Sequence, residues 1–238
     1  ILYRAEHQKL REMDDELVKI YSALTFVRAE DVDLKRENAN INADTAMGTM
    51  LKYGSEGAKS FYDKYVIPPH IAKAHAEGDI HIHDKDFYTL TETCCQIDLV
   101  KLFHDGFSTG HGFIRQPKSI ASYAALACIA IQANQNEMHG GQAIPAFDFY
   151  LAPYVRNSYI EEVKNLEDLN GVDYSHLYNK EIDDYVTRPL DGLTGDKRLV
   201  QHAINKTVSR VHQSMEAFIH NMNTIHSRGG NQVVFSSI

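Results

Sequence analysis

The sequence has little cysteine, no tryptophan and no long hydrophobic run, and these absences exclude several classes of protein. Only three of its 238 residues are cysteines, two of them adjacent, so it offers no disulfide framework and a reducing cytoplasm is the expected compartment. No apolar run approaches the ~20 residues that a membrane-spanning helix requires, and no secretory signal precedes the cysteines. We therefore expect no membrane partner.

Charge and composition describe an ordinary folded chain. The 24 basic and 32 acidic residues give a formal net charge of -8, which argues against non-specific binding to nucleic acid or to an anionic membrane. Hydrophobic residues make up 43% and charged residues 24%, as in soluble globular proteins. Any anionic ligand must therefore be held by a local site.

Hydrophobic periodicity and turn residues predict the order of the elements. The first part predicts a helix over 3–27, a polar connector over 31–43, a helix from an Asp44 cap to Pro68, a short helix ending near Gly78, and extended segments over 79–84 and 93–99. The remainder predicts a loop over 106–112, a helix opening at Pro117 and buried over 120–133, a strand over 143–151 that Pro145 weakens, helices over 154–166, 175–187 and 199–225, and a strand over 232–235. Extended segments separated by long helices indicate an α/β architecture.

Side-chain alternation sorts the extended stretch 93–99 into two faces. Cys95 falls on the apolar face, whereas Cys94 shares the other face with Gln96 and Asp98. A thiol beside an amide and a carboxylate suits a polar cavity, so Cys94 is the reactive candidate. The alternative is that both cysteines are buried small hydrophobes, as free cysteines usually are.

His81 and His83 also alternate, so the two imidazoles share a face and could reach one ligand together. A third ligand at helical spacing is missing and the cysteines lack the two-residue gap of a zinc pair, so we predict no metal site. Contact with substrate, or a structural role, is the expected use of these histidines.

Three further segments could approach a ligand. His139 and Gln142 flank a glycine pair that allows close backbone approach. Arg115 and Lys118 bracket Pro117 at an expected helix start, where free N–H groups and the helix dipole favour a phosphate, although solvated surface charges are the alternative. The sequence contains no Walker A loop, dinucleotide fingerprint or HExxH motif, so dehydrogenase function loses its usual support.

Several segments, in order, resemble the anaerobic (class III) ribonucleoside-triphosphate reductases, and the resemblance covers nearly the whole chain. The matching segments are ENAN (37–40), DTAMGTM (44–50), GDIHIHD (78–84), TCCQIDL (93–99), FSTGHG (107–112), HGGQ (139–142), HNMNTIHSR (220–228) and FSSI (235–238).

The resemblance implies a glycyl-radical enzyme with a ten-stranded α/β barrel that reduces ribonucleoside triphosphates to deoxyribonucleotides. Members are cytoplasmic homodimers, need a separate radical-SAM activase, and usually take electrons from formate. In the family a glycyl radical generates a thiyl radical that removes the ribose 3′ hydrogen. A second cysteine, which matches Cys94, assists reduction from the opposite face of the sugar.

The resemblance also assigns roles to the other candidates. It places substrate contacts at His81, His83, Gln96, His139, Gln142, Ser236 and Ser237. Ser236 and Ser237 open the segment expected to hold the substrate phosphates. Arg115 and Lys118 would meet the phosphates of an ATP or deoxynucleotide effector.

The family pattern extends past both ends of the chain. We expect the thiyl cysteine, the glycyl loop and a zinc site to lie beyond Ile238. Residues 1–37 would form a helical lead-in that carries the end of an ATP-cone, and residues 38–238 the first portion of the barrel. We therefore expect a fragment that turns over nothing alone.

Two other functions stay open from the sequence. A glycyl-radical lyase of the formate acetyltransferase type would share the barrel but need no nucleotide site. A non-catalytic effector-binding or dimerisation module would tolerate Cys94→Ser without loss of reduction.

Overall fold

The structure is a computed structural model that describes residues 15–21, 45–88, 92, 94–110, 112–138, 140–225 and 234–238. The chain divides into two compact units. The first comprises 1–94, 134–141 and 225–235, and the second 95–133, 142–224 and 236–238. Within the described ranges, none of the helices has the length and apolar character needed to span a bilayer.

The first unit contains two helices with clear start and stop signals. Helix α3 (Ala46–Tyr65) is capped by Thr45, whose side chain accepts a hydrogen bond from the Gly48 amide at 3.0 Å. The cap is therefore one residue later than predicted, and Asp44 lies outside the described residues. Helix α4 (Pro69–Glu77) starts on a proline and ends at Gly78 in a left-handed conformation, φ 83°, as predicted.

The predicted helix over 3–27 is described only at 15–21, which is helical, and the connector over 31–43 lies outside the described residues. Residues 15–21 pack on α3. The rings of Tyr21 and Tyr53 meet edge-on at 5.4 Å, and a Cβ on the buried Gly57 would lie 3.1 Å from Leu17. The absence of a side chain at Gly57 thus allows close approach of the two helices.

The second unit is built around a small parallel sheet. Strand β1 (Cys95–Gln96) pairs with β4 (Gln142–Ala143), which pairs with β5 (Ser236–Ser237), in the order β1-β4-β5. Helix α5 (Leu99–His104) follows β1, and β2 (Phe107–Ser108) and β3 (Phe113–Ile114) form an antiparallel pair.

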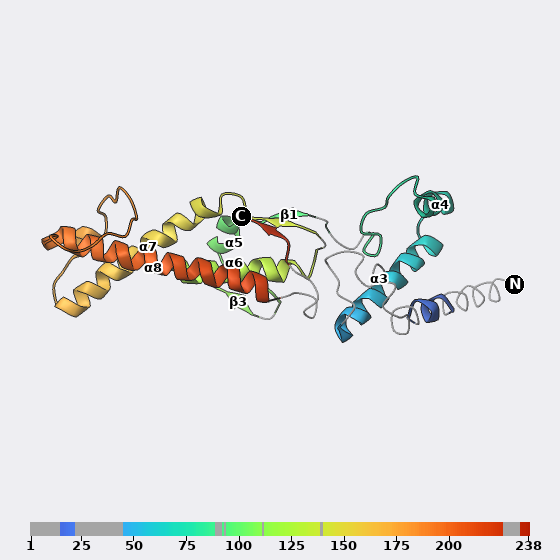
Figure 1. Cartoon of the computed structure of the whole chain (residues 1–238), viewed down its shortest axis with the longest axis horizontal. Coiled ribbons are helices and arrows are strands. Elements are labelled where there is room, and N and C mark those ends of the chain that lie inside the picture. Colours follow the sequence, from blue (N-terminus) through green and yellow to red (C-terminus); the bar gives the residue numbers. More distant parts are fainter. Residues whose placement is uncertain are drawn as a thin grey trace. The chain divides into compact units, whose positions relative to one another are not determined.

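Three long helices form the rest of this unit: α6 (Ile120–Asn134), α7 (Phe147–Asn170) and α8 (Gly195–Thr224). Helices α7 and α8 lie side by side (Figure 1). Their shared core consists of Tyr159, Val163, Leu177, Ala203 and Ile204. Helix α6 buries residues on several faces, as its apolar sequence predicts.

Several predicted boundaries were wrong. The helix predicted over 175–187 is only one 3₁₀ turn, η1 (Ser175–Leu177), and the chain from there to α8 is irregular. Side chains of α8 hold this irregular backbone: Gln201 donates to the Val186 carbonyl at 2.9 Å, and Asn205 donates to the Arg188 carbonyl at 2.8 Å. The strand over 143–151 stops at Ala143, and α7 begins at Phe147.

Other expected elements changed as well. Helix α6 begins three residues after Pro117, and the run 79–84 forms no strand. Of the strand expected over 232–235, residues 232–233 lie outside the described residues, and pairing occurs at Ser236–Ser237. The chain is thus a helix-rich α/β protein with a small parallel sheet, and its described strands do not close into a barrel.

Candidate active site

The parallel sheet gathers candidates that lie far apart in the sequence. Cys95 is in register with Gln142, which is in register with Ser236. Gln96 and Ser237 stand one step further along, on either side of Ala143. Cys94 directly precedes β1. Ligands bind at the carboxyl ends of parallel strands in open α/β sheets, and Gln96 and Ser237 lie at that end, whereas Cys94 lies at the amino end of β1.

The two cysteines differ in exposure as the alternation predicts. Cys94, Gln96 and Asp98 are exposed, whereas Cys95 and Ile97 are half-buried and Leu99 is fully buried. The pattern persists although the paired part of β1 is only two residues long. It presents the Cys94 thiol and leaves Cys95 partly packed, while the chemical role of Cys94 stays a prediction.

Two polar residues of this region are held by the protein itself. Asp98 caps α5, because its Oδ1 accepts a hydrogen bond from the Lys101 amide at 3.0 Å. The Gln142 side chain is buried, and its Nε2 donates to the Ile131 carbonyl of α6 at 3.0 Å. Gln142 therefore ties the central strand β4 to α6.

Three imidazoles gather in the first unit. The ring centroids of His81 and His83 are 5.9 Å apart, so the predicted proximity is confirmed. The ring of His75, from the last turn of α4, lies 5.6 Å from that of His81. His83 Nδ1 lies 3.0 Å from Asp84 Oδ1. The His75 side chain also lies close to the backbone of Ile80 and Ile82, the residues on either side of His81. The helical sequence pattern of α4 did not predict this contact.

Among the residues that the structure describes, no three His, Cys, Asp or Glu side chains are grouped as metal ligands. His139, another predicted substrate contact, lies outside the described residues. The neighbouring Gly140 is described and has φ 124°, a conformation that favours glycine.

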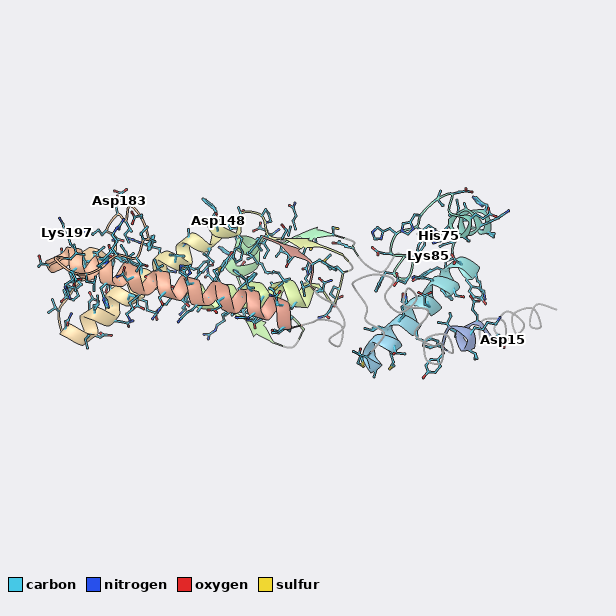
Figure 2. The ribbon with its side chains drawn as sticks, in the orientation of Figure 1. Asp15, His75, Lys85, Asp148, Asp183 and Lys197 are labelled. Atoms are coloured by element: carbon cyan, nitrogen blue, oxygen red, sulfur yellow. The ribbon has the colours of Figure 1, made fainter. Side chains whose placement is uncertain are left out.

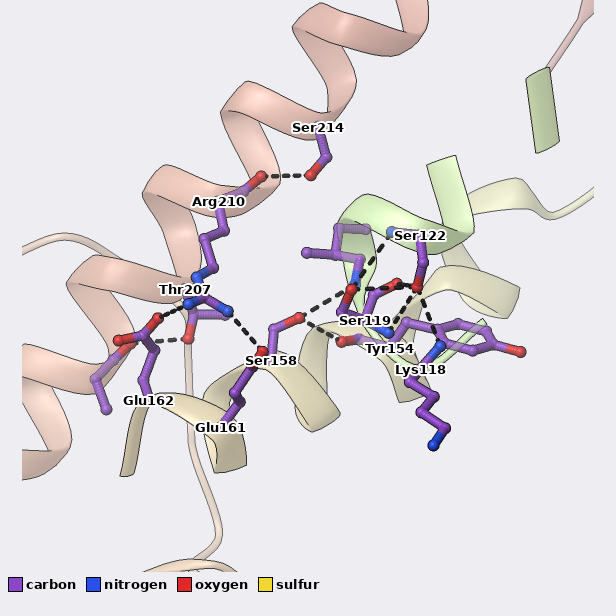
Figure 3. A network of polar contacts seen from close by, with 12 residues as sticks. Lys118, Ser119, Ser122, Tyr154, Ser158, Glu161, Glu162, Thr207, Arg210 and Ser214 are labelled. Atoms are coloured by element: carbon purple, nitrogen blue, oxygen red, sulfur yellow. Dashed lines mark hydrogen bonds and ion pairs between the residues drawn. The ribbon is translucent and has the colours of Figure 1, made fainter. Parts of the chain in front are cut away.

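Arg115 and Lys118 lie exposed between β3 and α6, where the Lys118, Ser119 and Ile120 amides already have hydrogen-bond partners. Figure 3 shows the serine hydroxyls that accept hydrogen bonds from these amides. The Lys118 and Ser119 amides donate to Ser122 Oγ at 3.1 and 3.0 Å, and the Ile120 amide donates to Ser158 Oγ at 3.1 Å. An anion here would rely on the two side-chain charges, because the nearby amides are already paired.

A hollow of about 280 Å³ lies beside this network, between α6, α7 and α8. Arg210 lines it and forms ion pairs with Glu161 at 2.7 Å and with the buried Glu162 at 2.6 Å (Figure 3). These ion pairs join α7 to α8. The pair with Glu161 spans 49 positions of sequence, so no local pattern could identify it.

Cys128 is the third thiol and is buried in α6. Burial raises the pKa of this thiol to about 11, because a thiolate there would be desolvated. Its Sγ donates to the Phe218 carbonyl at 3.7 Å. Cys128 is therefore a packed residue.

Comparison with known proteins places these residues in context. The family described as "Anaerobic ribonucleoside-triphosphate reductase" matches residues 37–238. The chain is 30% identical over 175 residues to the anaerobic ribonucleoside-triphosphate reductase of Haemophilus influenzae, covering 73% of this chain and 24% of that protein. It is 25% identical over 207 residues to the Escherichia coli protein of the same name, covering 86% of this chain and 26% of that protein.

A solved structure titled "Anaerobic ribonucleotide reductase" is similar with a TM-score of 0.48 and 12% identity, covering 91% of this chain and 42% of that one. The chain spans about a quarter of the length of these two curated relatives. Because the family match extends over most of the chain and includes Cys94 and the parallel sheet, this chain belongs to the anaerobic ribonucleoside-triphosphate reductase family.

Proposed function

We propose that the protein carrying this chain reduces ribonucleoside triphosphates to 2′-deoxyribonucleoside triphosphates, and that Cys94 acts on the sugar. The observation that carries the proposal is the exposed thiol of Cys94 beside a parallel sheet, in a chain that belongs to this family. The thiol at Cys95 is half-buried, which favours Cys94 as the reacting group.

The chain's own contribution would be made on one face of the ribose. A glycyl radical and the thiyl radical that it generates, both from residues outside this chain, would supply the hydrogen abstraction at C3′. Cys94 would assist reduction at C2′ from the opposite face after water leaves, with formate as the electron donor. Gln96 shares the exposed face with Cys94 and could donate hydrogen bonds to a sugar hydroxyl.

The family resemblance suggests further substrate contacts. Ser236 and Ser237 are exposed hydroxyls on β5, an edge strand of the parallel sheet, and would hold the substrate phosphates. His81 and His83, together with His139, would line the ribose or formate pocket. Gln142 would act by holding β4, the strand between β1 and β5, against α6.

Arg115 and Lys118 would hold the phosphates of a nucleotide effector. Both side chains are exposed, and no ion pair is recorded for either within the described part of the chain. The family resemblance further suggests a homodimer, activation by a radical-SAM activase, and a barrel completed by residues outside this chain. These partners are part of the proposal.

The proposal is tested with Cys94→Ser in the full-length protein, activated anaerobically and supplied with formate and a ribonucleoside triphosphate. We expect near-complete loss of deoxynucleotide formation with unchanged yield of the glycyl radical by electron paramagnetic resonance. Cys95→Ala is the matched control, and it should retain most activity because the neighbouring thiol faces the packing. Full reduction by Cys94→Ser would exclude the proposed role.

A further inference from the structure

The turn formed by residues 83–88 is docked on α3 by an ion pair whose lysine is nearly buried. Lys85 Nζ lies 2.7 Å from Asp63 Oδ2, and the Lys85 side chain is only 10% exposed. A lysine is almost never so covered unless its ammonium is paired. The contact therefore fixes the position of Lys85 relative to the C-terminal turn of α3.

Two more contacts join the same turn to the same helix. Ser55 Oγ donates to Asp86 Oδ2 at 2.7 Å, and the rings of Tyr62 and Tyr88 lie 5.2 Å apart. Ser55 and Tyr62 are two turns apart along α3, so the turn contacts α3 at two separate levels of the helix.

The backbone of this turn depends on such contacts. Asp84 has φ 48° and Tyr88 has φ 36°, conformations that are costly for residues with a side chain and for tyrosine in particular. The Phe87 and Tyr88 amides both donate to the Asp84 carbonyl, at 2.9 and 3.0 Å. Strained residues persist where surrounding contacts determine them, and here those contacts come from α3.

The histidine segment is held at its other end by α4. His75 Nδ1 lies 3.3 Å from both the Ile82 amide and the Ile80 carbonyl. One imidazole nitrogen of α4 therefore contacts the backbone of this segment at two points (Figure 2 labels His75 and Lys85). His81 and His83 therefore lie on a short segment between two attachments, one to α4 and one to α3. Moving either attachment would move both imidazoles.

We propose that Lys85, through its ion pair with Asp63, is a positioning residue that fixes His83 and His81 for contact with the substrate. Neither Lys85 nor Asp63 touches the imidazoles, so both act through the backbone of the turn. The proposal rests on the function proposed above, because it assumes that these histidines meet the substrate.

The test uses Lys85→Met in the full-length, activated enzyme, since methionine keeps the length of the stem and removes the ammonium. We expect kcat/KM for the ribonucleoside triphosphate to fall about tenfold, with unchanged glycyl-radical yield. Lys85→Arg should recover most of the loss because it restores the pair. Lys73→Met is the matched control: its lysine pairs with Glu77 at 3.6 Å in solvent, and it should behave as the wild type.

A second measurement reports on the imidazoles directly. Carbethoxylation of His81 and His83 by diethyl pyrocarbonate, followed by mass spectrometry, should change in rate by threefold or more in Lys85→Met and not in Lys73→Met. Asp63→Asn provides the same test from the other partner if Lys85→Met does not fold. Unchanged rates in the folded variants would overturn the proposal.

A variant that lacks both imidazoles separates the two ideas. In a His81→Ala/His83→Ala background, Lys85→Met should cause no further loss, because the residues through which it acts are gone. An equal loss in that background would overturn the positioning role. Full activity of His81→Ala/His83→Ala itself would instead exclude the substrate role of the histidines, while the modification rates still decide whether Lys85 positions them.

Discussion

Ser158 provides a sharp test of how the second unit is held together. It is completely buried on α7, and its Oγ accepts a hydrogen bond from the amide of Ile120, the first residue of α6, at 3.1 Å. Ser158→Ala leaves that amide buried and unpaired, because Ile120 is itself 0% exposed. The other bond of the hydroxyl, to the Tyr154 carbonyl at 2.9 Å, is less important because that carbonyl lies within α7.

The unpaired amide sets the magnitude. A buried donor without a partner costs about 1–3 kcal/mol, which corresponds to roughly 5- to 150-fold faster opening of the start of α6. Hydrogen–deuterium exchange of peptides over 118–124 in the full-length protein measures this opening. The expected result is an increase within that range, confined to α6 and to the part of α7 that contacts it.

Ser214→Ala is the matched control. Ser214 is also buried, but its Oγ donates only to the Arg210 carbonyl of its own helix, at 2.7 Å. Its removal leaves no donor unpaired, so exchange should change by about twofold or less. Equal effects of the two substitutions, or none from Ser158→Ala, would refute the argument that Ser158 caps α6.

Three other predictions concern the same unit and the thiols. At pH 8, iodoacetamide should label the exposed Cys94 and leave Cys128 unmodified, because a pKa of about 11 keeps roughly 0.1% of Cys128 as thiolate; equal labelling would contradict its burial. Because the pKa of Cys128 is raised in the folded state, the thiol binds its proton more tightly there than in the unfolded chain. Its contribution to stability is therefore lost as pH rises from about 9 towards 11, and hydrogen exchange measured across that window should detect the loss. Arg210→Met should destabilise the α7–α8 contact by roughly 1–3 kcal/mol, which is less than for a fully buried pair because the Arg210 side chain is 37% exposed. Glu161→Gln should cost under about 0.5 kcal/mol. Similar hydrogen-exchange rates in both variants would show that Glu162 does not depend on Arg210.

Local signals predicted the helices well where the residues near an end decide the end. Gly78 stops α4 by adopting a left-handed conformation, and the all-apolar run of α6 predicted a helix buried on several faces. Alternation predicted which of Cys94 and Cys95 is exposed, because successive side chains in extended backbone point to opposite sides whatever the strand pairs with.

Local signals failed where distant residues decide. The 175–187 segment has helical composition, but Gln201 and Asn205 of α8 bond to the backbone that follows η1, and those bonds replace helical ones. The start of α6 was predicted to offer free amides, yet Ser158, 38 positions away, occupies one of them.

The sequence by itself determined the family, through ordered motifs over most of the chain, and the exposed thiol, through a period of two residues. Tertiary structure alone decided that Gln96, Gln142 and Ser236 meet in one sheet, that Gln142 faces α6, and that Lys85 reaches Asp63. The physical reason is that strand pairing and ion pairs depend on which surfaces the folded chain brings together, and no local spacing encodes that choice.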